Sequence, residues 1–223
     1  MVERSEPSED RLLHALTTEH STLQTARIGA NSEASSRVLI FLSTLSNSIV
    51  ALAFVGQASN FGTPFYTFAL IILPAMAVIG FTTVMRTLQN MIDDAYYGVA
   101  INRIRQHYKT LHPDAESLMV LPTTGGLHAV RAEASLEKRV PRLQPLYMIS
   151  GMVAFVEALV TGAFVALLIN RVVEGAAVFA VAAGAATAIG VVIALFRFSR
   201  SYVWTALAKL GLTAPWKKER SGV

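Results

Sequence analysis

The stretch from Pro145 to Asn170, PLYMISGMVAFVEALVTGAFVALLIN, decides how the rest of the chain is organised. It is 26 residues long, and about 20 apolar residues are enough for a helix to cross a bilayer. Near its middle lies Glu157, the one ionisable residue deep inside any apolar stretch of the chain. A charge at the centre of a bilayer costs about 2.5 kcal/mol or more, so such a residue needs a reason. The stretch therefore predicts a membrane-spanning helix with a polar site at Glu157.

Small residues recur every fourth position along this stretch, at Ser150, Ala154, Ala158, Gly162 and Ala166. Helical residues four apart lie on nearly the same face, so the row predicts a surface on which a second helix packs closely. Glu157 and Thr161 flank the row, and we expect the carboxyl to face protein instead of lipid. Two interpretations stay open: a functional acid within the membrane, or a structural Glu that hydrogen-bonds one neighbouring helix.

The composition of the chain predicts the same class of protein. Of its 223 residues, 53% are hydrophobic and 15% are charged, whereas soluble domains carry roughly 25% charged residues. Three more apolar runs are long enough to cross a bilayer, Val38–Ala58, Pro64–Met85 and Gly175–Phe196. We expect an all-α, polytopic membrane protein with four transmembrane helices in two hairpins and long cytoplasmic helical extensions.

Several kinds of chemistry are disfavoured by the residues present. The chain has no cysteine, which excludes disulfides, thiol catalysis and Cys-based zinc sites. None of its five histidines has the spacing of a metal motif. Asp93 and Asp94 are adjacent and point about 100° apart on a helix, so we expect them to pair with nearby Arg. The predicted spans hold one carboxylate, no His and no Cys. We therefore predict no enzyme, no metal and no cofactor.

Polar residues in the first two spans suggest partners for Glu157. Ser43 and Asn47 share a face near the middle of Val38–Ala58, and Asn47 lies at about the depth of Glu157. Pro74, near the centre of the second span, removes one backbone hydrogen bond and frees the carbonyl of Leu70. We expect a kink there. These observations predict one intramembrane polar site made of Glu157, Asn47, Ser43, Thr161 and Pro74.

Two further rows of small residues lie on the last span. The first is Ala176, Ala180, Gly184 and Ala188, and the second is Ala182, Ala186, Gly190 and Ala194. Two such rows predict that this helix packs closely on two sides. The residues predicted to form the helix-packing surfaces are Ser150, Ala154, Ala158, Gly162, Ala180, Gly184 and Ala188.

Helices are also expected outside the spans. An amphipathic helix is predicted from about Ser8, and the second span is expected to continue past Arg86 to about Pro113 with two apolar stripes. A short helix is predicted over His128–Val140, and a basic helix after Phe196. The expected organisation is an N-terminal cytoplasmic helix (1–36), a first transmembrane hairpin (37–86), a cytoplasmic helical region (87–144), a second hairpin (145–197) and a basic cytoplasmic tail (198–223).

The distribution of basic residues predicts the orientation. Of the 19 Lys and Arg, only Arg171 lies in the two short turns, and all others lie in the N-terminal, middle and C-terminal segments. The positive-inside rule then places both termini and the middle segment in the cytoplasm, with the chain in the plasma or inner membrane. These bases are expected to contact the lipid bilayer at anionic head groups on its cytoplasmic face. They are divided among separate segments, which disfavours nucleic acid as a partner.

Two functions from different classes fit these features. The first is an oligomeric membrane interaction or pore-type protein, most simply a homo-oligomer, because small-residue rows favour helix association. The alternative is a small proton- or ion-coupled transporter that uses Glu157. We prefer the first, because four compact spans are few for a monomeric transporter and sufficient for one subunit of an oligomer.

Overall fold

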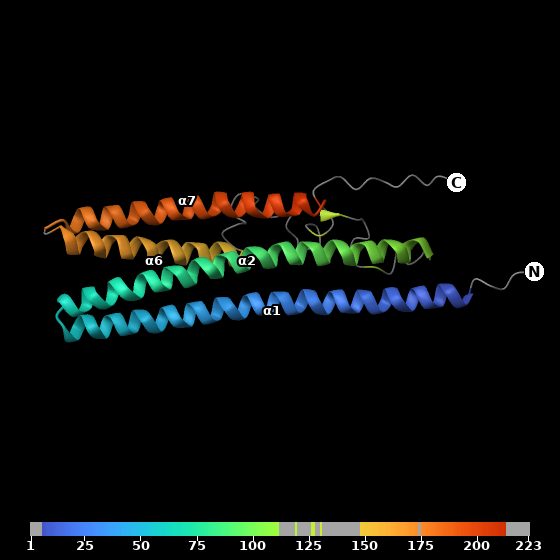
Figure 1. Cartoon of the computed structure of the whole chain (residues 1–223), viewed down its shortest axis with the longest axis horizontal. Coiled ribbons are helices and arrows are strands. Elements are labelled where there is room, and N and C mark those ends of the chain that lie inside the picture. Colours follow the sequence, from blue (N-terminus) through green and yellow to red (C-terminus); the bar gives the residue numbers. More distant parts are fainter. Residues whose placement is uncertain are drawn as a thin grey trace, which may run out of the picture. The chain divides into compact units, whose positions relative to one another are not determined.

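A computed structural model of the chain describes residues 6–111, 119, 126, 127, 130, 148–173 and 175–212. Four long α-helices make up almost all of this part: α1 (Glu6–Ala58), α2 (Thr63–Leu111), α6 (Ile149–Val172) and α7 (Ala177–Lys209) (Figure 1). The prediction of an all-helical chain with four apolar helices is confirmed.

Each of the four helices is long and apolar enough to cross a membrane. Between 17% and 33% of the most apolar 18-residue window of each helix is buried inside the molecule. Large apolar side chains are exposed on all four helices, for example Phe54, Ile71, Leu159 and Val181. Soluble monomers rarely expose apolar surface on this scale, and the structure is therefore that of a candidate membrane protein.

The first two helices are longer than the apolar runs inside them. The predicted N-terminal helix and first span form the single helix α1, which passes through Arg37 without a break. The predicted continuation of the second span past Arg86 is confirmed, because α2 passes through both Pro74 and Arg86 and ends at Leu111. Pro64 occupies the first turn of α2, where a missing N–H costs nothing.

The last two helices also differ from the predicted bounds. Helix α6 begins at Ile149, and Pro145 lies outside the described residues. Helix α7 continues through Phe196 to Lys209, so the predicted basic helix is the end of the same helix. Just beyond this end, Gly211 has a φ of 70°, and the Leu212 N–H bonds to the Leu207 carbonyl. Apart from position 130, the predicted helix over 128–140 lies outside the described residues, as does the tail from 213.

The chain divides into two compact units. Unit 1 contains Met1–Ser32, Asn90–Pro141 and Trp204–Val223, and unit 2 contains Glu33–Gln89 and Arg142–Val203, each as far as it is described. Helices α1, α2 and α7 contribute residues to both units. The predicted domain boundaries remain predictions.

In unit 1, the start of α1 packs against the end of α2. Val99, Ile101 and Ile104 of α2 are buried. On the α1 side, the Thr17 hydroxyl lies 3.4 Å from the hydroxyl of Tyr108, and the His20 ring stacks on the Tyr108 ring. The N-terminal part of α1 and the part of α2 beyond Arg86 are therefore in contact within unit 1.

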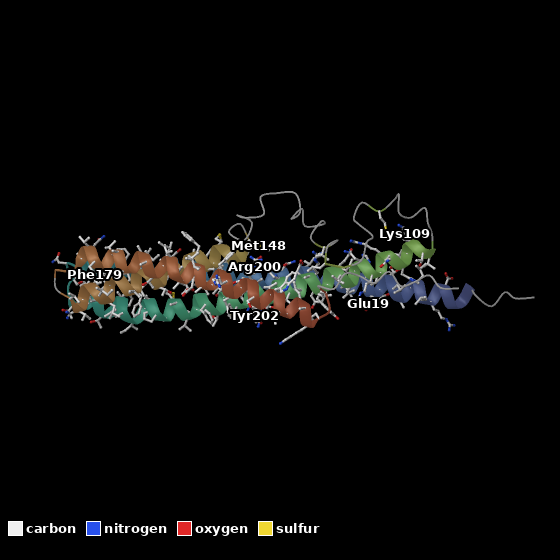
Figure 2. The ribbon with its side chains drawn as sticks, turned by 90° about the horizontal axis from the view of Figure 1, so that it is seen from above. Glu19, Lys109, Met148, Phe179, Arg200 and Tyr202 are labelled. Atoms are coloured by element: carbon white, nitrogen blue, oxygen red, sulfur yellow. The ribbon has the colours of Figure 1, made fainter. Side chains whose placement is uncertain are left out.

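In unit 2, α1 and α2 are joined by a short turn and pack along their apolar segments. Phe41 of α1, Val84 of α2 and Val153 of α6 are fully buried. The Ser48 hydroxyl of α1 contacts the Met76 sulfur of α2 at 3.6 Å. Figure 2 shows Phe179, near the start of α7, at one end of this unit, whereas Met148, Arg200 and Tyr202 lie towards the other end.

Candidate functional site

Glu157 lies in the interior of unit 2, on α6, and only 4% of its surface is exposed. Its Oε1 accepts a hydrogen bond of 3.1 Å from the hydroxyl of Thr161, one turn further along the same helix. Its Oε2 is buried and has no hydrogen-bond partner among the described residues. A buried carboxyl oxygen without a partner is costly, so this side chain is the strongest candidate for a functional group in the apolar part of the chain.

Gly80 of α2 makes room for this carboxyl. A Cβ placed on Gly80 would overlap Glu157 Oε2, and it would lie 2.9 Å from Glu157 Cδ and 3.0 Å from Phe41 Cζ. Helix α2 therefore packs this closely against the carboxyl only because residue 80 has no side chain. The candidate site combines three helices: Phe41 from α1, Gly80 from α2, and Glu157 with Thr161 from α6.

Three of the predicted site residues lie elsewhere. Asn47 and Ser43 are exposed on α1, and Glu157 forms its hydrogen bond with Thr161 instead of with Asn47. The buried face of α1 contains Phe41 and Leu45, and Asn47 lies about 200° around the helix from Leu45. The predicted pairing of Glu157 with Asn47 is thus not made in this chain.

Pro74 is half-buried on α2, six residues before Gly80. The carbonyl of Leu70, which we expected to accept from Glu157, lies ten residues before Gly80, roughly 15 Å along the helix. The sequence reasoning missed Gly80 altogether. The signal was present, since a glycine inside a helix costs about 1 kcal/mol relative to alanine and often marks a close approach.

The small-residue rows of α6 and α7 do meet. A Cβ on Gly162 would lie 2.6 Å from the Gly184 carbonyl oxygen and 2.9 Å from the Ala188 Cβ, and a Cβ on Gly184 would lie 2.7 Å from the Ala166 Cβ. Among the other predicted packing residues, Ala158 and Ala180 are buried, whereas Ser150 and Ala154 are half-buried. The two backbones approach closely at this crossing because both helices carry glycine there.

The second small-residue row of α7 has no such neighbour. Its members Ala182, Ala186, Gly190 and Ala194 are all exposed. No atom lies within 4 Å of the position that a Cβ on Gly190 would take. This face of α7 is therefore open among the described residues.

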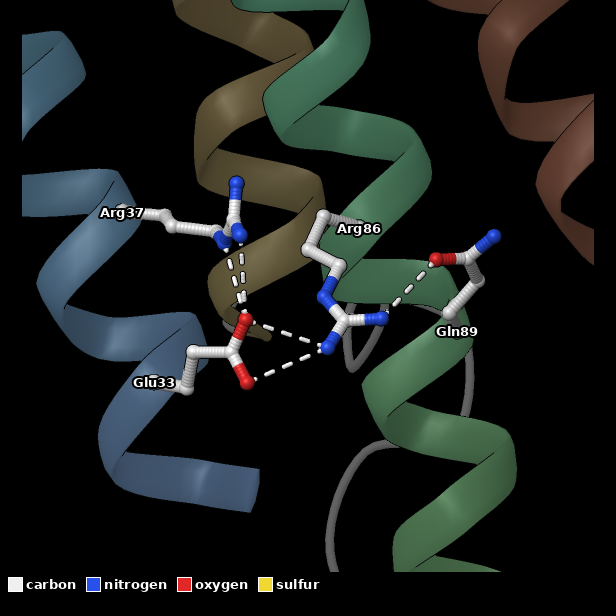
Figure 3. A network of polar contacts seen from close by, with 4 residues as sticks. All are labelled: Glu33, Arg37, Arg86 and Gln89. Carbon is white, nitrogen blue, oxygen red and sulfur yellow. Dashed lines mark hydrogen bonds and ion pairs between the residues drawn. The ribbon is translucent and has the colours of Figure 1, made fainter. Parts of the chain in front are cut away.

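A cluster of charges joins α1 to α2 at the end of the apolar segment of unit 2 (Figure 3). Glu33 accepts hydrogen bonds of 3.1 Å from Arg37, one turn later on α1, and from Arg86 of α2, which contacts both of its oxygens. Arg86 also donates to the Gln89 side-chain oxygen at 3.2 Å. The hydrogen bonds from Arg86 and then Arg37 lower the pKa of Glu33 from its ordinary value of 4.5.

A second polar contact joins the same helices inside unit 1. Arg27 of α1 donates to Asp94 of α2 at 2.7 Å, and Asn31 donates to the same carboxylate at 3.1 Å. Partial burial acts to raise the pKa of Asp94, but the hydrogen bonds from Arg27 and Asn31 and the charge of Arg27 bring the net pKa below its ordinary value. The predicted pairing of Asp94 with an arginine is confirmed.

The described residues contain no group of three or more His, Cys, Asp or Glu arranged to hold a metal ion. Comparison of the chain with protein-family models, with curated proteins and with solved structures gives no match. The function must therefore be argued from the helices and the contacts described above.

Proposed function

We propose that this chain is one subunit of a homo-oligomeric integral membrane protein of the interaction or pore type, without a catalytic role. In this proposal α1–α2 and α6–α7 form two transmembrane hairpins. The helical extensions, both termini and the segment between the hairpins lie in the cytoplasm. The basic residues at the cytoplasmic membrane surface contact anionic lipid head groups.

The open row of small residues on α7 carries this proposal. The first row of the same helix is covered by α6, where Gly162 and Gly184 bring the two backbones together. The second row has the same four-residue spacing and is exposed, with Gly190 in open space. A surface of small residues makes no special contact with lipid, but it allows the backbone of a second helix to approach into close van der Waals contact. A second subunit supplies that helix most simply.

The orientation is supported by short connections and by charge. Residues 59–62 and 173–176 connect the paired helices, and connections of this length favour antiparallel neighbours. Arg37, Arg86, Arg197 and Arg200 all lie on the far side of the apolar segments from these turns along their helices. By the positive-inside rule, the helix ends that carry these arginines lie on the cytoplasmic side.

Cysteine cross-linking tests the proposed interface directly, because the chain has no cysteine of its own. Two Cα atoms must approach to about 4.4–6.8 Å for a disulfide to form. We expect Ala186→Cys to form a disulfide-linked dimer on oxidation in native membranes. The matched control is Ala185→Cys, because Ala185 is also exposed but points about 100° away. Equal cross-linking of the two variants, or none of either, would contradict this interface.

The alternative is a small proton- or ion-coupled transporter, and the observation that favours it is the buried Glu157 carboxyl with its unpartnered Oε2. Glu157→Gln separates the two functions because glutamine keeps the size and hydrogen-bonding groups but cannot carry a proton or a charge. A transporter would lose ion flux in liposomes, or the pH dependence of that flux, while its assembly stays intact. A structural Glu157 predicts that assembly and function are both kept.

A further inference from the structure

An open cavity lies in unit 2, where α2 begins and α6 ends. It has a volume of about 280 Å³ and is lined by Gly62, Thr63, Tyr66, Asn170 and Arg171. Tyr66 and Asn170 are 104 residues apart in the chain, yet the Asn170 amide donates a hydrogen bond of 2.8 Å to the Tyr66 hydroxyl oxygen. This bond links α6 to α2 across the cavity.

Arg171 is the one charged residue among the described residues of the lining, and it lies near the ring of Tyr66. The guanidinium carbon of Arg171 lies 6.0 Å from the centroid of the Tyr66 ring, within the range of a cation–π contact. The Arg171 side chain is nevertheless exposed. A guanidinium carries five N–H donors in a rigid plane, and an exposed one can present them to a ligand.

The turn that forms one wall of the cavity is held by its backbone. Asn60 and Phe61 both have positive φ angles, 46° and 55°. The Phe61 N–H bonds to the Gly56 carbonyl at 2.8 Å, and the Gly62 N–H bonds to the Ser59 carbonyl at 2.9 Å. A Cβ on Gly62 would lie 2.9 Å from that same Ser59 oxygen, so a side chain at this wall would force the turn to change.

The chemistry of the lining selects an anion. The Tyr66 oxygen accepts from Asn170, which leaves the Tyr66 O–H free to donate to another group. Thr63 adds a second hydroxyl and Arg171 adds the positive charge, and no acidic residue is among the lining residues that the structure describes. A phosphate group has the geometry that an arginine recognises through two parallel hydrogen bonds.

We propose that this cavity binds the phosphate group of an anionic ligand through the guanidinium of Arg171 and the hydroxyls of Tyr66 and Thr63. Two sources share this chemistry: the head group of a membrane lipid and free inorganic phosphate. The lipid source rests on the proposed function, which puts this end of α2 and α6 at the external surface of the plasma or inner membrane. Arg171, in the last turn of α6, is the only Lys or Arg between Arg142 and Arg197. A ligand there accounts for a charge that the positive-inside rule disfavours on that side.

The experiment uses the full chain in nanodiscs, with two arms. In the first, native mass spectrometry counts phosphatidylglycerol molecules retained in mixed phosphatidylglycerol and phosphatidylcholine nanodiscs. In the second, inorganic phosphate is titrated into phosphatidylcholine nanodiscs. We expect Arg171→Gln to weaken retention or affinity about tenfold in at least one arm, since a hydrogen bond to a charged group contributes about 1.5–3 kcal/mol. Tyr66→Phe keeps the ring and removes the hydroxyl, and we expect a loss of about three- to tenfold.

Arg11→Gln is the control, because Arg11 is an exposed arginine near the start of α1, well before the apolar segment of that helix. An effect of Arg171→Gln in the lipid arm alone identifies a head group, and an effect in the phosphate arm identifies a soluble anion. The proposal is overturned if Arg171→Gln and Arg11→Gln behave alike in both arms. It is also overturned if Arg171→Gln lowers only thermal stability, as a charge that merely caps the end of α6 would. If a single, unassembled subunit binds phosphate, the proposed phosphate site stands and the proposed homo-oligomer fails.

Discussion

Oε2 of Glu157 on α6 occupies the space that a Cβ on Gly80 of α2 would take. The two residues are therefore coupled: the carboxyl is accommodated where it is because residue 80 is glycine. Phe41 of α1 closes the same space, since its Cζ lies 3.0 Å from that Cβ position. The packing of three helices around the buried acid depends on this one missing side chain.

Gly80→Ala is expected to destabilise the protein by about 1–3 kcal/mol, because an added methyl group must displace the carboxyl or part the helices. Glu157→Ala in the same chain should remove most of that cost, which a double-mutant cycle would measure as a coupling energy. The quantity to measure is the free energy of unfolding in mixed micelles.

Gly29→Ala is the matched control for this cycle. Gly29 is an exposed helical glycine of α1 whose Cβ position has no atom within 4 Å. This substitution should stabilise the protein by about 0.4–1 kcal/mol. If Gly80→Ala has the same effect as Gly29→Ala, the close contact between Gly80 and Glu157 does not exist.

Acid should weaken the contact between α1 and α2 through Glu33. The folded pKa of this residue is lowered from 4.5 by its bonds with Arg86 and Arg37. Its contribution to stability is therefore complete above about pH 4.5 and is lost as the pH falls through the folded pKa. We expect the melting temperature of the parent protein to fall with acid in that window, and that of Glu33→Gln to fall less. Glu19→Gln, at an exposed position of α1, is the control and should have the same pH profile as the parent. If Glu33→Gln also has the same pH profile as the parent, the charge cluster contributes nothing to stability.

The apolar face of α2 in unit 1 should not tolerate a charge. Val99 is 3% exposed, and Val99→Asp leaves a buried, unpaired carboxylate that costs roughly 3–5 kcal/mol. Ile28→Asp places the same group at a position of α1 that is 70% exposed and should be nearly neutral. Thermal unfolding followed by circular dichroism distinguishes them. Equal melting temperatures for the two variants would mean that α2 does not pack against α1 in unit 1.

The orientation of the chain is tested by where inserted tags can be labelled. Tags at either terminus or within residues 115–126 should react only after cells are permeabilised. A tag between Asn60 and Gly62 should react on intact cells, because the positive-inside rule puts this uncharged turn outside. Labelling of the 115–126 tag on intact cells would reverse or break the proposed arrangement.

The helices were predictable from the sequence because length and apolar content are enough to identify a candidate span. The continuity of α2 past Arg86 followed from the absence of proline between Pro74 and Pro113. The uninterrupted passage of α1 through Arg37 and of α7 through Phe196 did not follow, since a change from polar to apolar composition does not by itself end a helix.

The site was only partly predictable. The burial of Glu157 could be inferred from the spacing of residues within one helix, and so could the position of Thr161 beside it. The partner from another helix could not, because it depends on how each helix is rotated. Asn47 was at a suitable depth but lies about 200° from the buried Leu45. Gly80 faces the carboxyl instead. It offers no functional group, so its one signal in the sequence is a glycine inside a helix.

The central claim is that this chain is a subunit of a membrane-embedded homo-oligomer, and native mass spectrometry of the full chain in nanodiscs tests it most directly. We predict a particle that contains two or more chains, so that its protein mass is at least twice 24.1 kDa. We also predict that Ala186→Leu, which blocks the open row of α7, shifts the population towards the single chain, while Ala185→Leu does not. A parent protein found only at 24.1 kDa would contradict the account.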